Sequence, residues 1–413
     1  MPRPSRLFSC TAAALLATGL TGAGLGLGLA ASQTAGAATS WPAHVFAPYV
    51  DTGLSNTTLT TVAANYGTKY FLLAFVNGSG CQWSLPNQSG WQSQISALQA
   101  EGGDVSISFG GYTVDTDGSD LGNQCSSASA MATQVESAVT TLNVTHLDFD
   151  IESSEETNSA DFTRTAQALA QVRSWASSTG RTLNISYTLP ALPSGLTQDG
   201  LNVLNAAKSS GFKPDVVNIM TMDYGTSGTE MGTAANQALD ASAGQVASVF
   251  GVSNSAAYAM LGNTPMIGQN DSPGEIFSLA DASTVESHAA QEGIALLSFW
   301  SEGRDNGGCP GQTSASSTCS GVSQSNGAFT QAFQAFTSGG SSGGGGGGGN
   351  PTPPPTTPPP PPSGSCDPAW NNATAYTSGN QVSYNGHNWT ANQWNYDEVP
   401  GGPSGAWNDD GAC

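Results

Sequence analysis

Three carboxylic acids at alternate positions are the residues of this sequence best suited to do chemistry. Asp148, Asp150 and Glu152 stand in the segment HLDFDIE (residues 146–152), and Leu, Phe and Ile fill the positions between them. This alternation predicts a β-strand with one apolar and one acidic face. Same-face neighbours on a strand lie roughly 6.5–7 Å apart. Buried carboxylates in such a file repel one another, so we expect shared protons and separated pKa values, as in active sites.

Two structural interpretations of these acids compete with catalysis. They could form the solvent face of an ordinary strand, but that does not explain an acid at every alternate position. They could bind calcium, but calcium ligands usually come from loops. We therefore expect no metal site.

The charge of the chain limits its partners. Over 413 residues the formal net charge is −21, although charged residues make up only 9% of the chain. Such an acidic excess argues against nucleic acid and anionic membranes as partners. The hydrophobic fraction of 38% is enough for a packed core, and the length predicts more than one domain.

Residues 1–37 have the pattern of a secretory signal peptide. Arg3 and Arg6 precede an apolar run over residues 11–31, and the tripeptide AGA at 35–37 is a small-x-small cleavage signal. We expect cleavage after Ala37 and a secreted, extracellular protein; a retained membrane anchor is the alternative. No later segment is long and apolar enough to span a bilayer.

Six cysteines follow the predicted cleavage site, and an even number in an exported chain suggests disulfides. Proximity in sequence favours two pairs and leaves a third: Cys309–Cys319, Cys366–Cys413 and Cys81–Cys125. None of these cysteines has metal-ligand spacing with histidine.

Composition divides the rest of the chain into three regions. Residues 41–337 have a globular composition, residues 338–365 are rich in Gly and Ser and then in Pro and Thr, and residues 366–413 are rich in aromatic residues. The middle region cannot bury a core. We therefore expect a linker with a flexible glycine part and a semi-rigid proline part.

Strand and helix patterns alternate through the first of these regions. Strands are expected at 45–50, 70–76, 104–109, 146–151, 183–189, 216–222, 258–267 and 294–300. Helices are expected at 91–101, 128–142, 160–177, 201–210, 234–250, 284–292 and 328–336. This alternation predicts an α/β fold, a (β/α)8 barrel. A doubly wound open sheet is the alternative, but no Gly-x-Gly-x-x-Gly follows the first strand.

In such a barrel, chemistry takes place where the strands end, at the C-terminal rim. Polar and aromatic residues lie at several of the expected strand ends. They are Tyr49 at strand one, Ser108, Gly110 and Gly111 at strand three, Glu152 at strand four, Met222, Asp223 and Tyr224 at strand six, and Trp300 at strand eight. Each alone is a weak signal, whereas their joint occurrence favours a substrate site at the rim.

Two of these strands resemble the signature motifs of glycoside hydrolase family 18, the chitinases. The run SFGG at 108–111 is similar to one motif and DFDIE at 148–152 to the other. Trp300 resembles the tryptophan that forms the floor of the family's sugar site. The resemblance spans about residues 41–337. One departure is that the family's acidic motif usually begins with Asp, where this chain has Thr145.

Strand six also departs from the family's common Met-x-Tyr-Asp form. Met222-Asp223-Tyr224 resembles other members of the family, with Tyr224 as the tyrosine of the catalytic site. In the alternative register Met222 takes that position and Asp223 is used instead. The resemblance favours Tyr224.

The resemblance implies a substrate-assisted, retaining mechanism, an exception to the scheme of two catalytic carboxylates. Glu152 would protonate the glycosidic oxygen while the substrate's own N-acetyl oxygen attacks the anomeric carbon. Asp150 would hold the N-acetyl N–H, Asp148 would set the protonation state of Asp150, and Tyr224 would donate to the N-acetyl oxygen. Such a mechanism requires 2-acetamido sugars and no cofactor.

The length of one loop implies an open cleft. Family members with a deep groove carry an extra α+β insertion between strands seven and eight, and residues 268–294 leave no room for one. We therefore expect endo-type cleavage.

Residues 366–413 resemble the small chitin-binding modules of carbohydrate-binding families 5 and 12. The resemblance rests on Ala369-Trp370, Ala375-Tyr376, VSYNG at 382–386 and Trp389-Thr390-Ala391. So short a segment cannot bury all its aromatic residues, and exposed rings stack on sugar faces. Those expected in the core are Tyr376, Tyr384 and Trp389, and the binding candidates are Trp394, Tyr396 and Trp407.

The preferred interpretation is a secreted, monomeric, endo-acting chitinase whose partners are chitin and chito-oligosaccharides, and neither nucleic acid nor a membrane. An endo-β-N-acetylglucosaminidase that cleaves N-glycans would share the fold, but the C-terminal region argues against it. A non-catalytic chitin-binding lectin is a third interpretation, and the complete set of Asp148, Asp150 and Glu152 argues against that.

Overall fold

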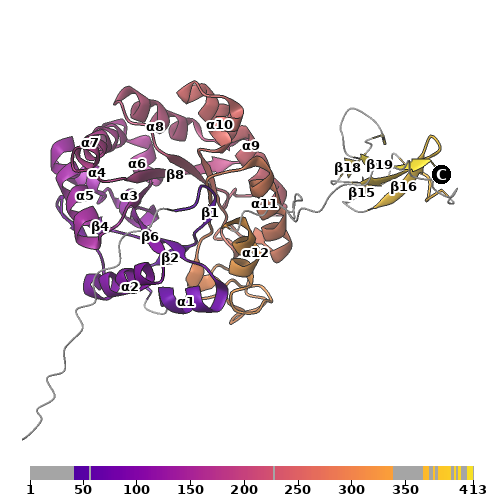
Figure 1. Ribbon diagram of the computed structural model, residues 1–413, viewed down its shortest axis with the longest axis horizontal. Helices are drawn as coiled ribbons and strands as arrows, with labels where there is room; N and C mark the ends of the chain where they lie inside the picture. Colours follow the sequence, from indigo (N-terminus) through magenta and orange to yellow (C-terminus); the bar gives the residue numbers. More distant parts are fainter. Residues whose placement is uncertain are drawn as a thin grey trace, which may run out of the picture. The chain divides into compact units, whose positions relative to one another are not determined.

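The computed structural model describes residues 41–54, 57–226, 228–337, 366–371, 375–376, 380–391, 395–396, 399–400 and 407–412. The chain divides into two compact units, Met1–Gly343 and Gly344–Cys413. The described part of the first is a barrel and that of the second a small set of strands (Figure 1). The predicted signal peptide, residues 1–37, and the predicted linker, residues 338–365, lie outside the described residues.

The first unit is built on nine parallel strands that occupy eight positions, because β1 and β2 share one. These strands are β1 (Val45–Phe46), β2 (Tyr49–Asp51), β3 (Tyr70–Ala74), β6 (Asp104–Gly110), β7 (His146–Asp150), β8 (Asn184–Leu192), β10 (Val216–Met220), β11 (Leu261–Thr264) and β14 (Leu296–Leu297). The predicted α/β class and (β/α)8 barrel are confirmed.

Closure of the barrel depends on the first stretch of the globular chain. β1 pairs with β14, β2 pairs with β3, and only Ala47 and Pro48 separate β1 from β2. Pro48 has no N–H to donate, and its carbonyl accepts a hydrogen bond from the backbone N–H of Leu72 at 3.0 Å. A single segment therefore joins the two edges of the sheet.

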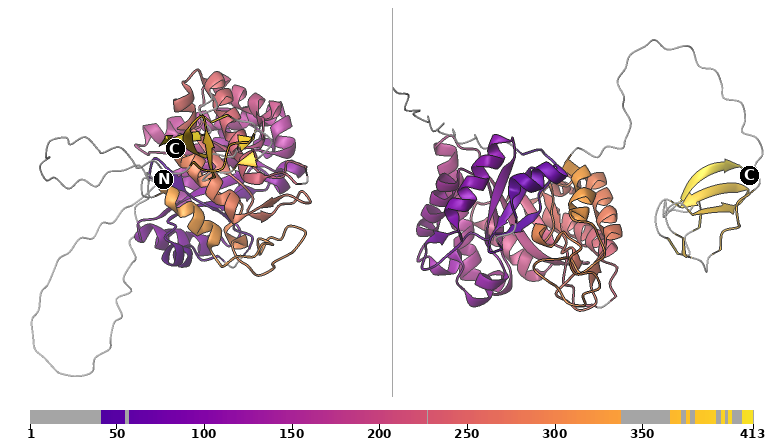
Figure 2. Two further views of the ribbon diagram at one scale, coloured as in Figure 1. Left: turned by 90° about the vertical axis from the view of Figure 1, so that its right-hand side faces the viewer. Right: turned by 90° about the horizontal axis from the view of Figure 1, so that it is seen from below.

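Helices surround these strands (Figures 1 and 2). The longer ones are α1 (Leu59–Tyr66), α2 (Gln88–Ala100), α5 (Ala128–Leu142), α7 (Ser159–Ser178), α8 (Gln198–Ser209), α9 (Met231–Phe250), α11 (Leu279–Glu292) and α12 (Ala328–Thr337). The shorter ones are α3 (Tyr112–Asp117), α4 (Leu121–Gln124), α6 (Ser153–Thr157), α10 (Asn254–Tyr258) and the 3₁₀ helix η1 (Glu302–Arg304). Short strands outside the barrel positions are β4 (Asn77–Gly78), β5 (Trp83–Ser84), β9 (Gly195–Leu196), β12 (Gly268–Gln269) and β13 (Ile276–Phe277).

Local signals explain where the predicted elements were accurate. Helix α5 covers the predicted residues because Ser127 caps its first turn and Asn143 ends it in the left-handed conformation.

The predicted strand at 258–267 was wrong at its start. The Ser253 side chain accepts a hydrogen bond from the N–H of Ala256 and begins the short helix α10, so the strand itself starts at Leu261.

Side chains alternate between two cores on the barrel wall. Leu147, Phe149 and Ile151 of the β7 segment point outward into the core between the sheet and its helices, and each is 3% exposed or less. A second core lies inside the barrel and contains Tyr49 and Leu72, with Trp300 packed against it. The predicted division of the acidic segment into an apolar and an acidic face is therefore confirmed.

Two of the predicted disulfides are present, Cys81–Cys125 and Cys309–Cys319. The predicted partner of Cys366, Cys413, lies outside the described residues. Among the helices of the described ranges, none has the length and apolar character needed to cross a membrane.

The second unit contains short antiparallel strands. They are β15 (Ala375–Tyr376), β16 (Gln381–Tyr384), β17 (His387–Ala391), β18 (Asn395–Tyr396) and β19 (Trp407–Ala412). β17 pairs with β16 and β19, and β15 pairs with β18. The predicted all-β character of this unit is confirmed.

The aromatic residues of the second unit need one correction. Trp407, predicted to be an exposed binding residue, is only 7% exposed and packs edge-on against Tyr376 in the core. Tyr376 is buried as predicted, whereas Tyr384 and Trp389 are half-buried. Tyr396 lies in β18, and Trp394 lies outside the described residues.

Candidate active site

Strand β7 brings the three acids to the inside and the C-terminal end of the barrel. Asp148 is fully buried, Asp150 is 5% exposed, and Glu152 follows the strand at its rim, where it is half-buried. Their backbone neighbours are fixed on both sides, since β7 pairs with β6 and β8 along its whole length. The acids therefore sit on a rigid part of the scaffold.

Asp148 is the most extensively hydrogen-bonded of the three. Its Oδ2 accepts from the hydroxyls of Tyr49 at 2.8 Å and Ser108 at 2.6 Å. Its Oδ1 accepts from the hydroxyls of Ser186 at 2.6 Å and Thr188 at 2.8 Å. Burial raises the pKa of Asp148, and these four hydrogen bonds oppose that rise because they stabilise the carboxylate.

Asp150 lies next in the file and lacks this support. Its Oδ1 is buried and has no hydrogen-bond partner among the described residues. Burial raises its pKa well above the ordinary value, and the charges of Glu152, Asp148 and Asp115 raise it further. Asp150 therefore retains a proton more readily than Asp148, whose four donors favour the charged form.

Glu152 combines access with a raised pKa. The pKa of Glu152 is raised to about 7, and burial is the largest cause. A hydrogen bond from the backbone N–H of Tyr112 opposes the rise, whereas the charges of Glu156 and Asp223 add to it. The backbone N–H of Glu152 donates to Asp115 Oδ2 at 3.0 Å. A half-buried carboxylic acid with such a pKa can donate a proton near neutral pH.

Gly110 and Gly111 let neighbouring groups approach the acids closely. A Cβ on Gly110 would lie 2.1 Å from the carbonyl oxygen of Asp150, and one on Gly111 would lie 2.5 Å from the ring of Phe75. Both glycines have positive φ, 93° and 90°, which favours glycine. The N–H of Gly111 also donates to the carbonyl of Asp150 at 2.9 Å.

Trp300 lies on the interior side at the end of the last strand, as predicted. Its ring is half-buried and stacks on Phe75 with a centroid distance of 5.9 Å and an interplanar angle of 19°. It also lies 5.9 Å from the ring of Tyr49. The hydroxyl of Tyr49 reaches Asp148, so one ring connects the acidic file to this aromatic surface.

The structure favours the second of the two registers considered for strand six. Asn218 points into the barrel, where its amide donates to Thr188 at 3.0 Å, so Met220, the last residue of β10, lies on the same inward face. The Tyr224 ring instead packs against the outer core, and its hydroxyl is buried.

The electrostatic effects agree with this placement. The charge of Asp223 raises the pKa of Glu152, whereas the pKa of Tyr224 is raised by burial and by Glu275. Asp223 is held by the N–H of Ser272, which donates to its Oδ1 at 2.7 Å. The Tyr224 ring thus lies against the outer core, the charge of Asp223 acts on Glu152, and the role of Tyr224 toward a substrate stays a prediction.

Thr145, where this chain differs from the family's acidic motif, immediately precedes β7, at the end of the strand opposite Glu152. Thr145 donates to Asp104 Oδ2 at 3.3 Å, and Asp104 is fully buried. A neighbouring strand thus supplies a carboxyl group beside Thr145.

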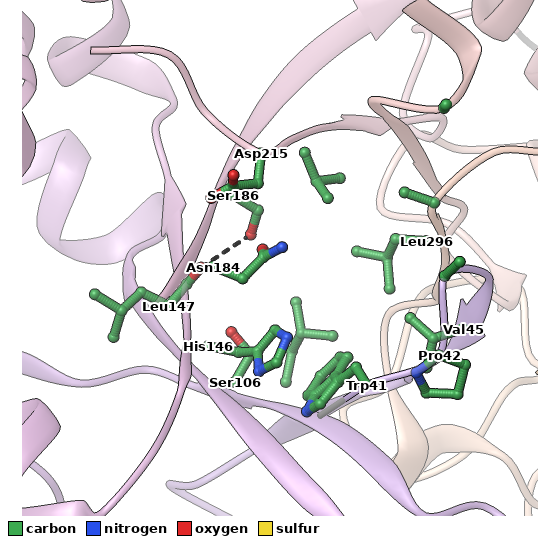
Figure 3. Close-up of a pocket in the computed structure, with 15 residues that line it drawn as sticks. Trp41, Pro42, Val45, Ser106, His146, Leu147, Asn184, Ser186, Asp215 and Leu296 are labelled. Carbon is green, nitrogen blue, oxygen red and sulfur yellow. Dashed lines mark hydrogen bonds between the residues drawn. The ribbon is translucent and has the colours of Figure 1, made fainter. Parts of the chain in front are cut away.

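A cavity of about 290 Å³ lies near the beginnings of the strands, away from Glu152. Figure 3 shows Trp41 beside His146 in this cavity, and their rings stack at 4.2 Å. Burial lowers the pKa of His146 to about 3. A neutral histidine under an indole fits packing at the base of the barrel better than proton transfer.

Several site residues were missed by the sequence analysis because nothing local identifies them. Phe75, Asp115, Ser186, Thr188 and Glu275 come from four parts of the chain, Ser186 and Thr188 both lying on β8, and meet the acids or their supports only in the folded chain. The available signal was a position within a predicted strand, for Phe75, Ser186 and Thr188, or after one, for Asp115 and Glu275. One group of acids near Glu152 has spacing that could hold a metal: Asp115, Asp120 and Glu155.

Comparison with known proteins identifies both units. Residues 45–286 match the family described as Glycosyl hydrolases family 18. Residues 369–408 match Carbohydrate-binding module family 5/12. These ranges agree with the barrel and with the C-terminal strands.

Two curated proteins are similar in sequence. The probable bifunctional chitinase/lysozyme of Escherichia coli (strain K12) is 35% identical over 320 residues, which cover 72% of this chain and 35% of that protein. Endochitinase 11 of Metarhizium anisopliae is 35% identical over 282 residues, which cover 64% of this chain and 53% of that protein. The chain therefore matches only about a third to a half of the length of these relatives.

Solved structures share the barrel. The catalytic domain of a hyperthermophilic chitinase from Pyrococcus furiosus has a TM-score of 0.66 and 32% identity, covering 73% of this chain and 98% of that one. Mutants of active domain 2 of a chitinase from the same organism, complexed with chito-oligosaccharides, give the same TM-score and identity. The matched sequence, the barrel and the acidic file agree, and the chain belongs to glycosyl hydrolase family 18.

Proposed function

We propose that the chain is a chitinase that hydrolyses β-1,4 linkages between N-acetylglucosamine units by a substrate-assisted, retaining mechanism. The observation that carries the proposal is the difference among the three acids. Glu152 is accessible and has a pKa of about 7, Asp150 is buried with a much higher pKa, and Asp148 is held by four hydroxyls. Only one of them is suited to donate a proton to the substrate.

In the proposed reaction, Glu152 protonates the glycosidic oxygen as the bond to the leaving sugar breaks. The N-acetyl oxygen of the substrate forms a bond to the anomeric carbon and gives an oxazolinium intermediate. Asp150 accepts the hydrogen bond of the acetamido N–H, and its coupling to Asp148 allows the proton it held to be shared within the pair. Glu152 then removes a proton from the attacking water, which restores the acid and retains the configuration.

The names of the relatives and the C-terminal module support chitin as the substrate. Chitinase or endochitinase appears in the names of both curated relatives and of the Pyrococcus furiosus structures. The match of residues 369–408 to a carbohydrate-binding module adds a second part suited to a polysaccharide. Chitin is extracellular and insoluble, so we also propose that the signal peptide pattern at residues 1–37 directs export.

The stereochemistry of the products tests the mechanism. We expect newly formed reducing ends from chitohexaose to be β-anomers, because attack by the acetamide and then by water inverts the anomeric carbon twice. Chromatography of fresh digests with anomer detection measures this. Release of α-anomers would show direct attack by water and would contradict the mechanism.

Replacing the proton donor tests its identity. We expect Glu152→Gln to reduce turnover of chitin oligomers by about 10²–10⁴-fold or more and to retain chitohexaose binding, because Gln keeps the size and the backbone N–H that donates to Asp115. Steady-state kinetics and calorimetry measure the two quantities. Glu101→Gln, a change of the same kind at an exposed residue at the end of α2, is the control. Wild-type turnover in Glu152→Gln would exclude this role.

The alkaline side of the pH profile should report the pKa of Glu152. The acid must be protonated to act and its pKa is raised to about 7, so we expect kcat/KM to fall as pH rises through about 7. Asp223→Asn removes a negative charge that favours the protonated form, so the decline should begin at lower pH. Asn can still accept the hydrogen bond from Ser272. A decline that stays in place, or moves to higher pH, would show that Asp223 does not act on Glu152.

The loop between the last two barrel strands supports internal cleavage. Between β11 and β14 the structure contains the pair β12–β13 and helix α11, and no additional domain among these described residues. We propose an open cleft and endo-action, so the viscosity of a soluble chitin derivative should fall before many reducing ends accumulate. Release of dimers from one chain end at constant viscosity would contradict endo-action.

Removal of residues 338–413 tests the role of the module. We expect slower hydrolysis of crystalline chitin and unchanged hydrolysis of chitohexaose, because binding of the module to the polymer raises the local substrate concentration. Reducing-end assays on both substrates measure this. An equal loss on both substrates would assign the region a role in the barrel itself.

A further inference from the structure

A second group of buried acids lies beside the catalytic file and is not used in the proposed reaction. We call Asp115, Asp120, Glu155 and Asp161 the inner acid cluster; they are 0%, 3%, 4% and 2% exposed. They come from α3, the start of α4, α6 and α7, which are in contact and lie together in Figure 1. Four buried carboxyl groups this close require either protons or a cation.

Protein cations do not neutralise the cluster. Within the described ranges, the two ion pairs are Arg173–Asp215 and His288–Asp240, and neither includes a member of the cluster. Arg164 is near enough to lower the pKa of Asp161, but its guanidinium donates to the carbonyl of Gly122. The negative charge is therefore largely uncompensated by side chains.

Backbone N–H groups donate to one oxygen of Asp115 and to one of Asp120. Asp115 Oδ2 accepts from the N–H of Glu152 at 3.0 Å, and Asp120 Oδ1 accepts from the N–H of Asn123 at 2.8 Å. Among the described residues, the other oxygens, Asp115 Oδ1 and Asp120 Oδ2, and also Asp161 Oδ1, are buried and accept no hydrogen bond from an N–H or hydroxyl group. Carboxyl groups of the cluster face one another instead, Asp115 with Glu155 and Asp120 with Asp161. Backbone N–H groups thus hold the carboxyl groups of Asp115 and Asp120, while their other oxygens face carboxyl groups inside the protein.

The carboxyl groups converge. One oxygen from each of Asp115, Asp120 and Glu155 lies within 4.8 Å of the other two. Asp161 is directed to the same region, since a Cβ on Gly122 would lie 2.1 Å from Asp161 Oδ1 and 3.1 Å from Asp120 Oδ1. Oxygen atoms bound to one calcium ion at about 2.3–2.6 Å are spaced in this way.

We propose that Asp115, Asp120 and Glu155 bind a calcium ion, with Asp161 adding negative charge beside them. Calcium is favoured over magnesium because the ligands are carboxylates from three separate elements in a buried place. Magnesium usually keeps several waters and uses one or two carboxylates. The ion would connect α3, α4 and α6, the three short helices next to Glu152.

The site would stabilise the segment that carries the proton donor. Asp115 binds the N–H of Glu152 through one oxygen and would bind the ion through the other. Without an ion, burial and mutual repulsion raise the pKa of Asp115 and of Asp161 to about 8, so the cluster would share protons instead. The two states predict different responses to calcium.

Titration of the full-length protein distinguishes them. After removal of metal with EDTA, we expect calorimetry with CaCl₂ to show one site per chain, and MgCl₂ to bind more weakly. CaCl₂ should raise the melting temperature, because a ligand that binds only the folded state stabilises it. Absence of calcium binding by the wild-type protein up to about 10 mM, well above the range of weak extracellular sites, would show that protons occupy the cluster and would overturn the proposal.

Variants locate the site. We expect Glu155→Gln and Asp120→Asn each to weaken calcium binding by at least about tenfold and to lose the calcium-dependent rise in melting temperature. Glu101→Gln, which removes an exposed charge, should bind as the wild type does. Asp120→Asn keeps the oxygen that caps α4, so it can fold even if Glu155→Gln does not. Undiminished binding in a folded variant of either residue would place the ion elsewhere and contradict the assignment.

Discussion

The site depends on one buried carboxylate. Asp148 points into the barrel and accepts hydrogen bonds from Tyr49 on β2, Ser108 on β6, and Ser186 and Thr188 on β8. A charge at this depth is stable only where such donors surround it. The same contacts join three other strands to β7, so the fold of the barrel interior and the protonation of Asp150 have a common cause. Asp148 is fixed by these donors, whereas Asp150 keeps an oxygen without a partner among the described residues.

Sequence periodicity predicted much of this arrangement for a physical reason. A strand turns alternate residues to opposite faces, so DFDIE identified both the inward acids and the outward core of Phe149 and Ile151. The barrel followed from repeated strand and helix patterns, and the two glycines after Phe109 were correctly placed at the rim. The disulfides Cys81–Cys125 and Cys309–Cys319 followed from spacing.

The remaining features depend on contacts between distant parts of the chain. Tyr224 follows Asp223, which adopts a positive φ of 53°, so alternation along strand six no longer indicates where the ring points. Trp407 was predicted to be exposed because the module is small, yet pairing of β19 with β17 places it in the core. Asp115 lies 37 residues from Glu152 in sequence, and no local pattern connects them.

The disulfide between Cys81 and Cys125 makes the covalent link between two segments at the rim of the barrel depend on redox conditions. It ties the β4–β5 turn to the end of α4, the helix that Asp120 begins, across 44 residues. Thiols in a reducing compartment stay unpaired, so there these two rim segments would be joined by packing alone. An oxidising environment would therefore add a covalent link between these two rim segments.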